Sequence, residues 1–210
     1  MSLSYALVSE GGDDRMLHAP IDWLLGQHCR VPFSGVWANP ASMNDRSRVV
    51  STRLSEVERY YPCDLAFVHR DTDNSSVQHR VAEIMQAARS SGYPTPIVCV
   101  IPVRMTEAWF LFDEVAIRRA AGNPNSRVPL GLPGFQVVQR RANPKQIIEQ
   151  SLVLASELRG RKLSQFQAGI SNRKSLVAAY IDDFSPLRSH RSFAQFESDL
   201  VAMLRARGWG

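Results

Sequence analysis

The chain has little cysteine and no long apolar run. Only three of its 210 residues are cysteines, and Cys29, Cys63 and Cys99 lie far apart. An odd, scattered set argues against a disulfide framework or a zinc site and favours reduced thiols in the cytoplasm. No segment approaches the roughly 18 apolar residues of a membrane helix, and no basic and apolar signal segment begins the chain. We therefore expect a cytoplasmic protein with no membrane partner.

The sequence also lacks the glycine-rich loops that most often bind phosphate. The run Glu10-Gly11-Gly12-Asp13-Asp14 is not followed by Gly-Lys-Ser/Thr, and its glycines do not have the spacing of a dinucleotide-binding turn. These glycines allow a tight turn between a strand and a helix. The turn either carries function or is a plain connection in which Asp13 caps the helix.

Charge is distributed unevenly along the chain. Residues 1–117 hold 10 Lys and Arg against 14 Asp and Glu, a net charge of −4. Residues 118–210 hold 15 against 6, a net charge of +9. An acidic site beside a surface that binds nucleic acid would have this pattern. The alternative is a solvated basic face without a partner.

Apolar runs alternate with helix-like segments in the first part of the chain. Strands are expected at 5–10, 35–37, 64–70 and 97–103, and helices at 13–27, 43–60 and 76–91, with a further helix that Thr106 can cap and that carries Glu107. This alternation predicts an α/β fold in which helices flank a mainly parallel sheet. Ligands of such sheets bind outside the carboxyl ends of the strands.

The chain changes character after residue 117. We expect residues 1–117 to form the α/β core and residues 118–210 to form a basic, mostly helical extension that packs on the core. Glycines and prolines predict a loop over 121–143, and helices are expected at 144–159, 172–181 and 190–207. The apolar face of the last helix either covers the main core or forms a homodimer.

Carboxylates follow three of the expected strands. They are Asp71 with Asp73, Glu10 with Asp13 and Asp14, and Glu107. Clustered carboxylates are costly to desolvate unless a cation meets them, and a divalent metal is the commonest partner of clustered oxygen ligands. The pattern therefore predicts a metal site. Taken singly, Asp73 could lie near a helix start, Glu107 could be a favourable first-turn acid, and His69 could be a core residue.

Three segments resemble a known family. They are Leu7-Val8-Ser9-Glu10-Gly11-Gly12-Asp13-Asp14, His69-Arg70-Asp71-Thr72-Asp73, and the run from Ile101 to Asp113. A Glu after the first strand and Asp-x-Asp after a later one resemble the Toprim domain of topoisomerases, primases and nucleases of the overcoming-lysogenization-defect type. Within this group the chain resembles the bacterial family called domain of unknown function 4276. The family signature Glu-Ala-Trp-Leu-Leu-Ala-Asp is similar to residues 107–113, with Phe110 and Phe112 as departures.

The resemblance implies a Toprim-like, Rossmann-like fold and Mg²⁺- or Mn²⁺-dependent hydrolysis of phosphodiesters in DNA or RNA, for example in phage defence. It implies catalytic roles for Glu10, Asp71, Asp73 and Glu107, and metal binding by these residues together with Asp14. Glu10 could act as acid or base instead of as a ligand. Two alternatives remain open. One is a metal-dependent phosphatase or nucleotide-sugar transferase, and the other is a non-catalytic module that binds nucleic acid or a separate partner ATPase.

Basic side chains are candidate contacts for the nucleic acid, because arginine and lysine neutralise phosphate with little base readout. For Arg70 and Arg104 the alternative is that they neutralise the acids themselves, and for most of the others it is ordinary solvation. The candidates are Arg70, Arg104, Arg140, Arg141, Lys145, Arg173 and Lys174.

Overall fold

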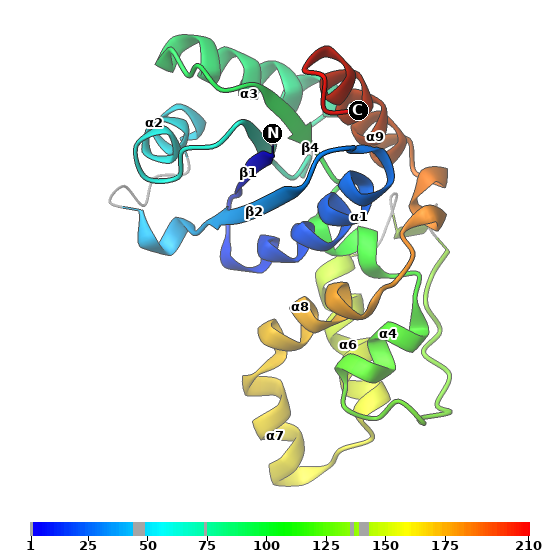
Figure 1. Cartoon of the computed structure of the whole chain (residues 1–210). Coiled ribbons are helices and arrows are strands. Elements are labelled where there is room, and N and C mark those ends of the chain that lie inside the picture. Colours follow the sequence, from blue (N-terminus) through cyan, green and yellow to red (C-terminus); the bar gives the residue numbers. More distant parts are fainter. Residues whose placement is uncertain (1, 44–48, 74, 135–136, 139–142) are drawn as a thin grey trace.

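The structure is a computed structural model that describes residues 2–43, 49–73, 75–134, 137–138 and 143–210 (Figure 1). Four parallel strands form one sheet in the order β2-β1-β3-β4. The strands are β1 (Leu3–Val8), β2 (Phe33–Ala38), β3 (Leu65–His69) and β4 (Ile97–Val100). The described part of the chain contains eight α-helices. The predicted α/β fold with a parallel sheet is therefore confirmed.

Helices connect the successive strands and cover both faces of the sheet. The connecting helices are α1 (His18–His28), α2 (Val50–Tyr60) and α3 (Val77–Ser91). Helices α2 and α3 pack on the face that contains Ala6 and Val8, whereas α1 packs on the face that contains Leu7. The chain therefore changes face and direction between β1 and β3. Ligands of open parallel sheets bind at such a switch point, beyond the carboxyl ends of the strands.

Strand β3 is buried along its whole length. Leu65 and Phe67 belong to one core, and Ala66 and Val68 belong to the other, because successive side chains of a strand point to opposite faces. A strand covered on both faces has apolar residues at nearly every position. This explains the unbroken apolar run that precedes Asp71.

The rest of the chain is helical. Its helices are α4 (Glu114–Ala120), α6 (Pro144–Ser156), α7 (Gly160–Ala168), α8 (Ile170–Tyr180) and α9 (Arg191–Ala206). Helices α4, α6 and α8 contact one another, and α7 lies farthest from the sheet in Figure 1. Helix α9 returns to β4, and its apolar face, which includes Phe193 and Phe196, is buried in the core that contains Phe67. This face therefore covers the main core. Among the described residues, no helix is long and apolar enough to span a membrane.

The described chain also contains short 3₁₀ helices, and the first and third of them replace parts of the expected α-helices. The 3₁₀ helices are η1 (Gly12–Leu17), η2 (Pro40–Ser42), η3 (Thr106–Phe110) and η4 (Ser185–Ser189). The helix expected over 13–27 begins as η1 and continues as α1. The helix expected at Glu107 is only η3, and a separate helix, α4, begins where the Asp113 side chain accepts a hydrogen bond from the Ala116 amide.

The later helices also differ in their bounds. Helix α7 was not expected from the sequence, and Gly169 separates it from α8. The helix expected over 43–60 is observed as α2, and residues 44–48 lie outside the described chain. Residues 121–134 of the expected loop form no helix, as their glycines and prolines predict, whereas Val137 and Val138 in the same expected loop are helical. Residue 117, where the core was expected to end, lies inside α4.

Candidate functional site

A hollow of about 410 Å³ lies at the carboxyl ends of β1 and β3. The turn after β1, the loop after β3 and the start of α6 contribute to its lining. Its charged lining residues are Glu10, Asp13, Asp14, Asp71, Glu107 and Lys145. Carboxylates from all three predicted acidic segments therefore meet at the edge of the sheet where ligands were expected.

The backbone of the turn after β1 fixes Asp14. Its Oδ2 atom accepts hydrogen bonds from the Gly11 amide at 2.8 Å and from the Glu10 amide at 3.1 Å. The Arg53 guanidinium of α2 donates to the Glu10 carbonyl at 3.1 Å and stabilises the same turn. Because Oδ2 is occupied by amides, Oδ1 is the oxygen of Asp14 that faces His69 at the end of β3.

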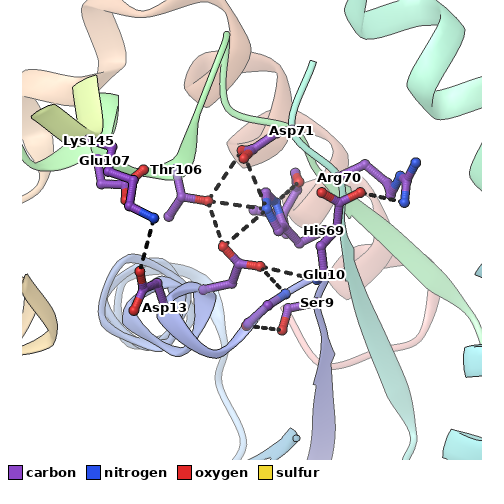
Figure 2. A network of polar contacts seen from close by, with 12 residues as sticks. Ser9, Glu10, Asp13, His69, Arg70, Asp71, Thr106, Glu107 and Lys145 are labelled. Carbon is purple, nitrogen blue, oxygen red and sulfur yellow. Dashed lines mark hydrogen bonds and ion pairs between the residues drawn. The ribbon is translucent and has the colours of Figure 1, made fainter. Parts of the chain in front are cut away.

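Asp14, His69, Asp71 and Thr106 form one group, called the His69 cluster below. His69 Nε2 lies 3.6 Å from Asp14 Oδ1 and 3.5 Å from Asp71 Oδ1. The Thr106 hydroxyl lies 3.2 Å from Asp14 Oδ1, 3.4 Å from Asp71 Oδ1 and 3.2 Å from His69 Nε2. Figure 2 shows the contacts of Thr106 with His69 and Asp71. Two carboxylate oxygens that follow different strands therefore face the same two side chains.

The orientation of His69 is set by β4. His69 Nδ1 lies 2.9 Å from the Val100 carbonyl oxygen, which can only accept, so Nδ1 carries a hydrogen. Nε2 then faces the carboxylates either as the lone pair of neutral imidazole or as the second N–H of imidazolium. The His69 side chain is completely buried, so it cannot turn to another partner without opening the core.

Asp71 is the most strongly perturbed acid of the hollow. Burial raises the pKa of Asp71 to about 7; His69 lowers this pKa, whereas Asp14, Glu10 and Glu107 raise it. A pKa this high means that ionised Asp71 lacks sufficient positive charge nearby. Carboxylates perturbed in this way are concentrated at functional sites.

Asp13, Glu107, Glu149 and Lys174 form a second group, called the Lys174 cluster below. The Lys174 side chain is 1% exposed, and its Nζ lies 2.5 Å from Asp13 Oδ2, 3.1 Å from Glu107 Oε1 and 3.5 Å from Glu149 Oε1. Burial lowers the pKa of Lys174, but Asp13 and Glu107 outweigh burial and the net pKa is raised. Burial likewise raises the pKa of Asp13, but Lys174 and the Ser171 hydroxyl lower it overall. Lys174 and Asp13 are therefore both ionised at neutral pH.

Residues that are adjacent in the sequence belong to different clusters. Asp13 faces Lys174, whereas Asp14 faces His69. Glu107 also faces Lys174, whereas Thr106 contacts His69. In Figure 2, Asp13, Glu107 and Lys145 lie on one side of Thr106, and His69 and Asp71 lie on the other. The short turns of η1 and η3 therefore contact two different basic side chains, His69 and Lys174.

Asp73 does not join Asp71 in the His69 cluster. Its Oδ2 atom lies 3.2 Å from a terminal guanidinium nitrogen of Arg80 on α3, and its side chain is 58% exposed. Asp73 and Arg104 both have left-handed backbone conformations, with φ of 50° and 69°, which are strained for residues other than glycine. The Asp73 amide donates to the Arg104 carbonyl at 3.2 Å, and the Arg104 amide donates to the Thr72 hydroxyl at 2.6 Å. These bonds hold the loops after β3 and β4 together.

Glu10 lines the hollow but already has a cationic partner. Its carboxylate forms an ion pair with Arg70, and the same guanidinium lies 3.0 Å from Glu83 Oε1 of α3. Arg70, predicted to contact nucleic acid, therefore lies between two carboxylates. Glu10 could contact a ligand in the hollow only by exchanging or sharing this partner.

The other predicted nucleic-acid contacts have different surroundings. Lys145 lines the hollow, and its side chain is 49% exposed. Arg173 donates to the Ala120 carbonyl at 3.0 Å and lies over the Phe166 ring, so it makes structural contacts. Lys174 is buried. Arg140 and Arg141 lie outside the described residues.

The donors of the hollow suit Mg²⁺, although they do not form a rigid metal cage. Within the described ranges, no three His, Cys, Asp or Glu side chains are already arranged to hold a metal ion. Mg²⁺ usually binds through one or two carboxylates, and water and substrate phosphates complete its coordination. Asp14 and Asp71 provide such a pair, and carboxylate oxygen is the donor that Mg²⁺ and Mn²⁺ prefer. The raised pKa of Asp71 agrees with a place that a cation would stabilise.

Two central residues were missed or misplaced by sequence reasoning. Thr106 was expected only to cap a helix, but its hydroxyl joins Asp14, His69 and Asp71. Its position after a strand that ends at the same edge was an available signal. Lys174 was expected to contact phosphate, and nothing in the local sequence indicates its burial.

Comparison with known proteins finds no matching family model, no matching curated protein and no matching solved structure. The structure itself defines an α/β protein with a carboxylate-lined hollow at the switch point of a parallel sheet. The chemistry of the two clusters is therefore the basis for a functional assignment.

Proposed function

We propose that the protein is a Mg²⁺- or Mn²⁺-dependent nuclease with a Toprim-like, Rossmann-like fold. The observation that carries this proposal is the convergence of Asp14 Oδ1 and Asp71 Oδ1 on His69 Nε2. The pair lies at the switch point of the sheet, where α/β proteins bind ligands. Resemblance of the three acidic segments to Toprim sequences supports the same function.

Asp14 and Asp71 would hold the divalent ion in this proposal. A bound ion of this kind stabilises negative charge on a phosphoryl oxygen and makes a water molecule more acidic. Asp71 must be ionised to bind the ion, so binding releases a proton from any Asp71 that is protonated. His69 and the Thr106 hydroxyl keep the two carboxylates in place. Glu10 lines the same hollow and is the candidate for proton transfer.

Nucleic acid is the substrate class that the charge distribution favours. Lys145 lines the hollow with a side chain that is 49% exposed, and residues 118–210 carry a net charge of +9. Lysine beside a metal-binding carboxylate pair can attract the phosphate that completes the coordination of Mg²⁺. Contacts of this kind position a phosphate backbone without reading its bases.

A non-catalytic module that binds nucleic acid or a partner ATPase is the second candidate. The observation that favours it is the number of acids that already have cationic partners. Glu10 faces Arg70, Asp73 faces Arg80, and Asp13 and Glu107 face Lys174. Acids paired in this way stabilise a fold without performing chemistry. The two candidates differ in whether metal-dependent cleavage occurs.

The test is cleavage of labelled single-stranded DNA, duplex DNA, plasmid and RNA with Mg²⁺ or Mn²⁺. Asp71→Asn keeps the shape of the side chain and removes its charge, and Asp182→Asn is a matched control because Asp182 is exposed. We expect metal-dependent cutting by the wild type and the control, and background cutting by Asp71→Asn. Equal cutting by Asp71→Asn would contradict the proposal. Tight binding by the wild type without cutting would favour the non-catalytic module and direct the search to a separate ATPase or activator.

A further inference from the structure

Lys174 is a buried cation that joins three elements of the structure. Its Nζ reaches Asp13 of η1, Glu107 of η3 and Glu149 of α6 from its own position on α8. A buried ammonium is stable only when it is well paired, and loss of one partner leaves buried charge uncompensated. The geometry therefore fixes Asp13 and Glu107, two acids that line the hollow, against a permanent positive charge.

Asp13 and Glu107 both already have the Lys174 ammonium as a partner. Asp13 Oδ2 contacts Lys174, Asp13 Oδ1 accepts a hydrogen bond from the Ser171 hydroxyl, and Lys145 Nζ lies 4.0 Å from Oδ2. Glu107 is buried, and its Oε1 atom contacts Lys174. The carboxylates of the Lys174 cluster are therefore already compensated.

The His69 cluster differs in this respect. In the described part of the chain, no lysine or arginine lies within ion-pair distance of the Asp14 or Asp71 carboxylate. Enzymes that use two metal ions hold them about 3.5–4 Å apart with carboxylates on both sides. Here one of the two groups of carboxylates surrounds an ammonium group, and the other does not.

We propose that Lys174 is a positioning residue whose fixed positive charge limits the hollow to one divalent ion, held by Asp14 and Asp71. This inference rests on the proposed function. Asp13 and Glu107 then line the hollow without ligating metal, although both belong to the acidic segments that follow the strands. The ammonium group takes the place that a second ion would occupy. Substrate phosphate accordingly meets one exchangeable ion and not the buried Lys174 ammonium.

The number of Mn²⁺ ions bound to the full chain tests this inference. Isothermal titration calorimetry and the electron paramagnetic resonance signal of free Mn²⁺ both give this number without any measurement of activity. We expect one ion for the wild type. Glu107→Gln and Asp13→Asn should also bind one ion, with a Kd within about threefold of the wild type. Lys174→Met should bind a second ion, because Asp13 and Glu107 lose their cation.

Lys162→Met is the matched control, because Lys162 is an exposed lysine of α7. It should bind one ion, as the wild type does. Circular dichroism shows which variants fold, and if Lys174→Met does not fold, Glu107→Gln and Asp13→Asn decide the question. Two ions in the wild type, one ion in folded Lys174→Met, or loss of the ion in Glu107→Gln would overturn the inference alone. No ion in the wild type would overturn the metal proposal together with it.

Discussion

The His69 cluster and the Lys174 cluster share one hollow but differ in the side chains that face their carboxylates. In the His69 cluster, two carboxylates face an imidazole and a hydroxyl, and burial raises the pKa of Asp71 to about 7. In the Lys174 cluster, three carboxylates face a buried ammonium, and the pKa of Asp13 is lowered despite its burial. The negative charge of the carboxylates is therefore insufficiently compensated in the His69 cluster and is compensated in the Lys174 cluster.

Removal of the ammonium should have the largest effect on stability. Lys174→Met leaves Asp13 and Glu107 without their buried partner, so we expect a loss of about 3–5 kcal/mol in the free energy of unfolding. Urea denaturation measures this loss. Lys145→Met is the matched control, because the Lys145 side chain is 49% exposed and such a pair contributes at most about 1 kcal/mol. Equal losses in the two variants would mean that the buried ammonium of Lys174 is not the charge that compensates Asp13 and Glu107.

Binding of a divalent ion should raise the thermal stability of the protein, and variants of the two clusters should show which cluster holds the ion. At a Mg²⁺ or Mn²⁺ concentration of about 100 times Kd, binding to the folded chain adds about 2.7 kcal/mol. We expect this gain at pH 8 for the wild type and for Glu107→Gln, and none for Asp71→Asn. Differential scanning fluorimetry with and without the ion measures the change in Tm. Loss of the gain in Glu107→Gln would place the ion in the Lys174 cluster instead.

The metal-free protein should show the charge deficit of the His69 cluster as a dependence of stability on pH. Asp71 has a pKa of about 7 in the folded chain, against about 4 for an unfolded aspartate. The folded chain therefore binds this proton more tightly, so stability falls as pH rises from about 4 to 7 and is constant above that window. Asn imitates the protonated carboxyl at every pH.

The difference between Asp71→Asn and the wild type isolates this effect, because all other groups titrate in both proteins. Relative to the variant, the wild type should lose on the order of 2 kcal/mol between pH 5 and pH 8. Urea denaturation at both pH values, without divalent ions, measures it. A difference that is independent of pH would show that Asp71 is already compensated in the folded chain.

Substitution of Asp73 should have the smallest effect, although the position of Asp73 beside Asp71 in the sequence predicts a catalytic role. Its carboxylate contacts Arg80 and is 58% exposed, so the exposed pair contributes at most about 1 kcal/mol. We expect Asp73→Asn to cleave nucleic acid within about threefold of the wild-type rate. Abolished cleavage would show that the loop after β3 rearranges to bring Asp73 to the metal.

The sheet could be predicted from the sequence because strands covered on both faces have unbroken apolar runs. The predicted strands at 5–10 and 64–70 correspond to β1 and β3. Short helices were less predictable, since a single capping side chain decides where they begin. Asp113 starts α4 in this way. Helix α7 has few apolar residues, and only Gly169 separates it from α8.

The position of the site could also be predicted, but not the assignment of its acids. Parallel strands bring their carboxyl ends to one edge, so Glu10, Asp71 and Glu107 were expected together. Whether Asp13 or Asp14 faces His69 depends on the turn of η1, which the sequence does not specify. Lys174 contributes to the positive charge of its half in the same way as an exposed lysine, so charge counting could not reveal its burial.

The most direct measurement is a crystal structure with Mn²⁺, in which anomalous scattering locates the ion. The account predicts one anomalous peak, in contact with the carboxylates of Asp14 and Asp71, with Lys174 still bound to Asp13 and Glu107. A peak between Asp13 and Glu107, or two peaks in the hollow, would contradict the assignment of the two clusters. A protein saturated with Mn²⁺ in solution but without a peak at Asp14 and Asp71 would contradict the central claim.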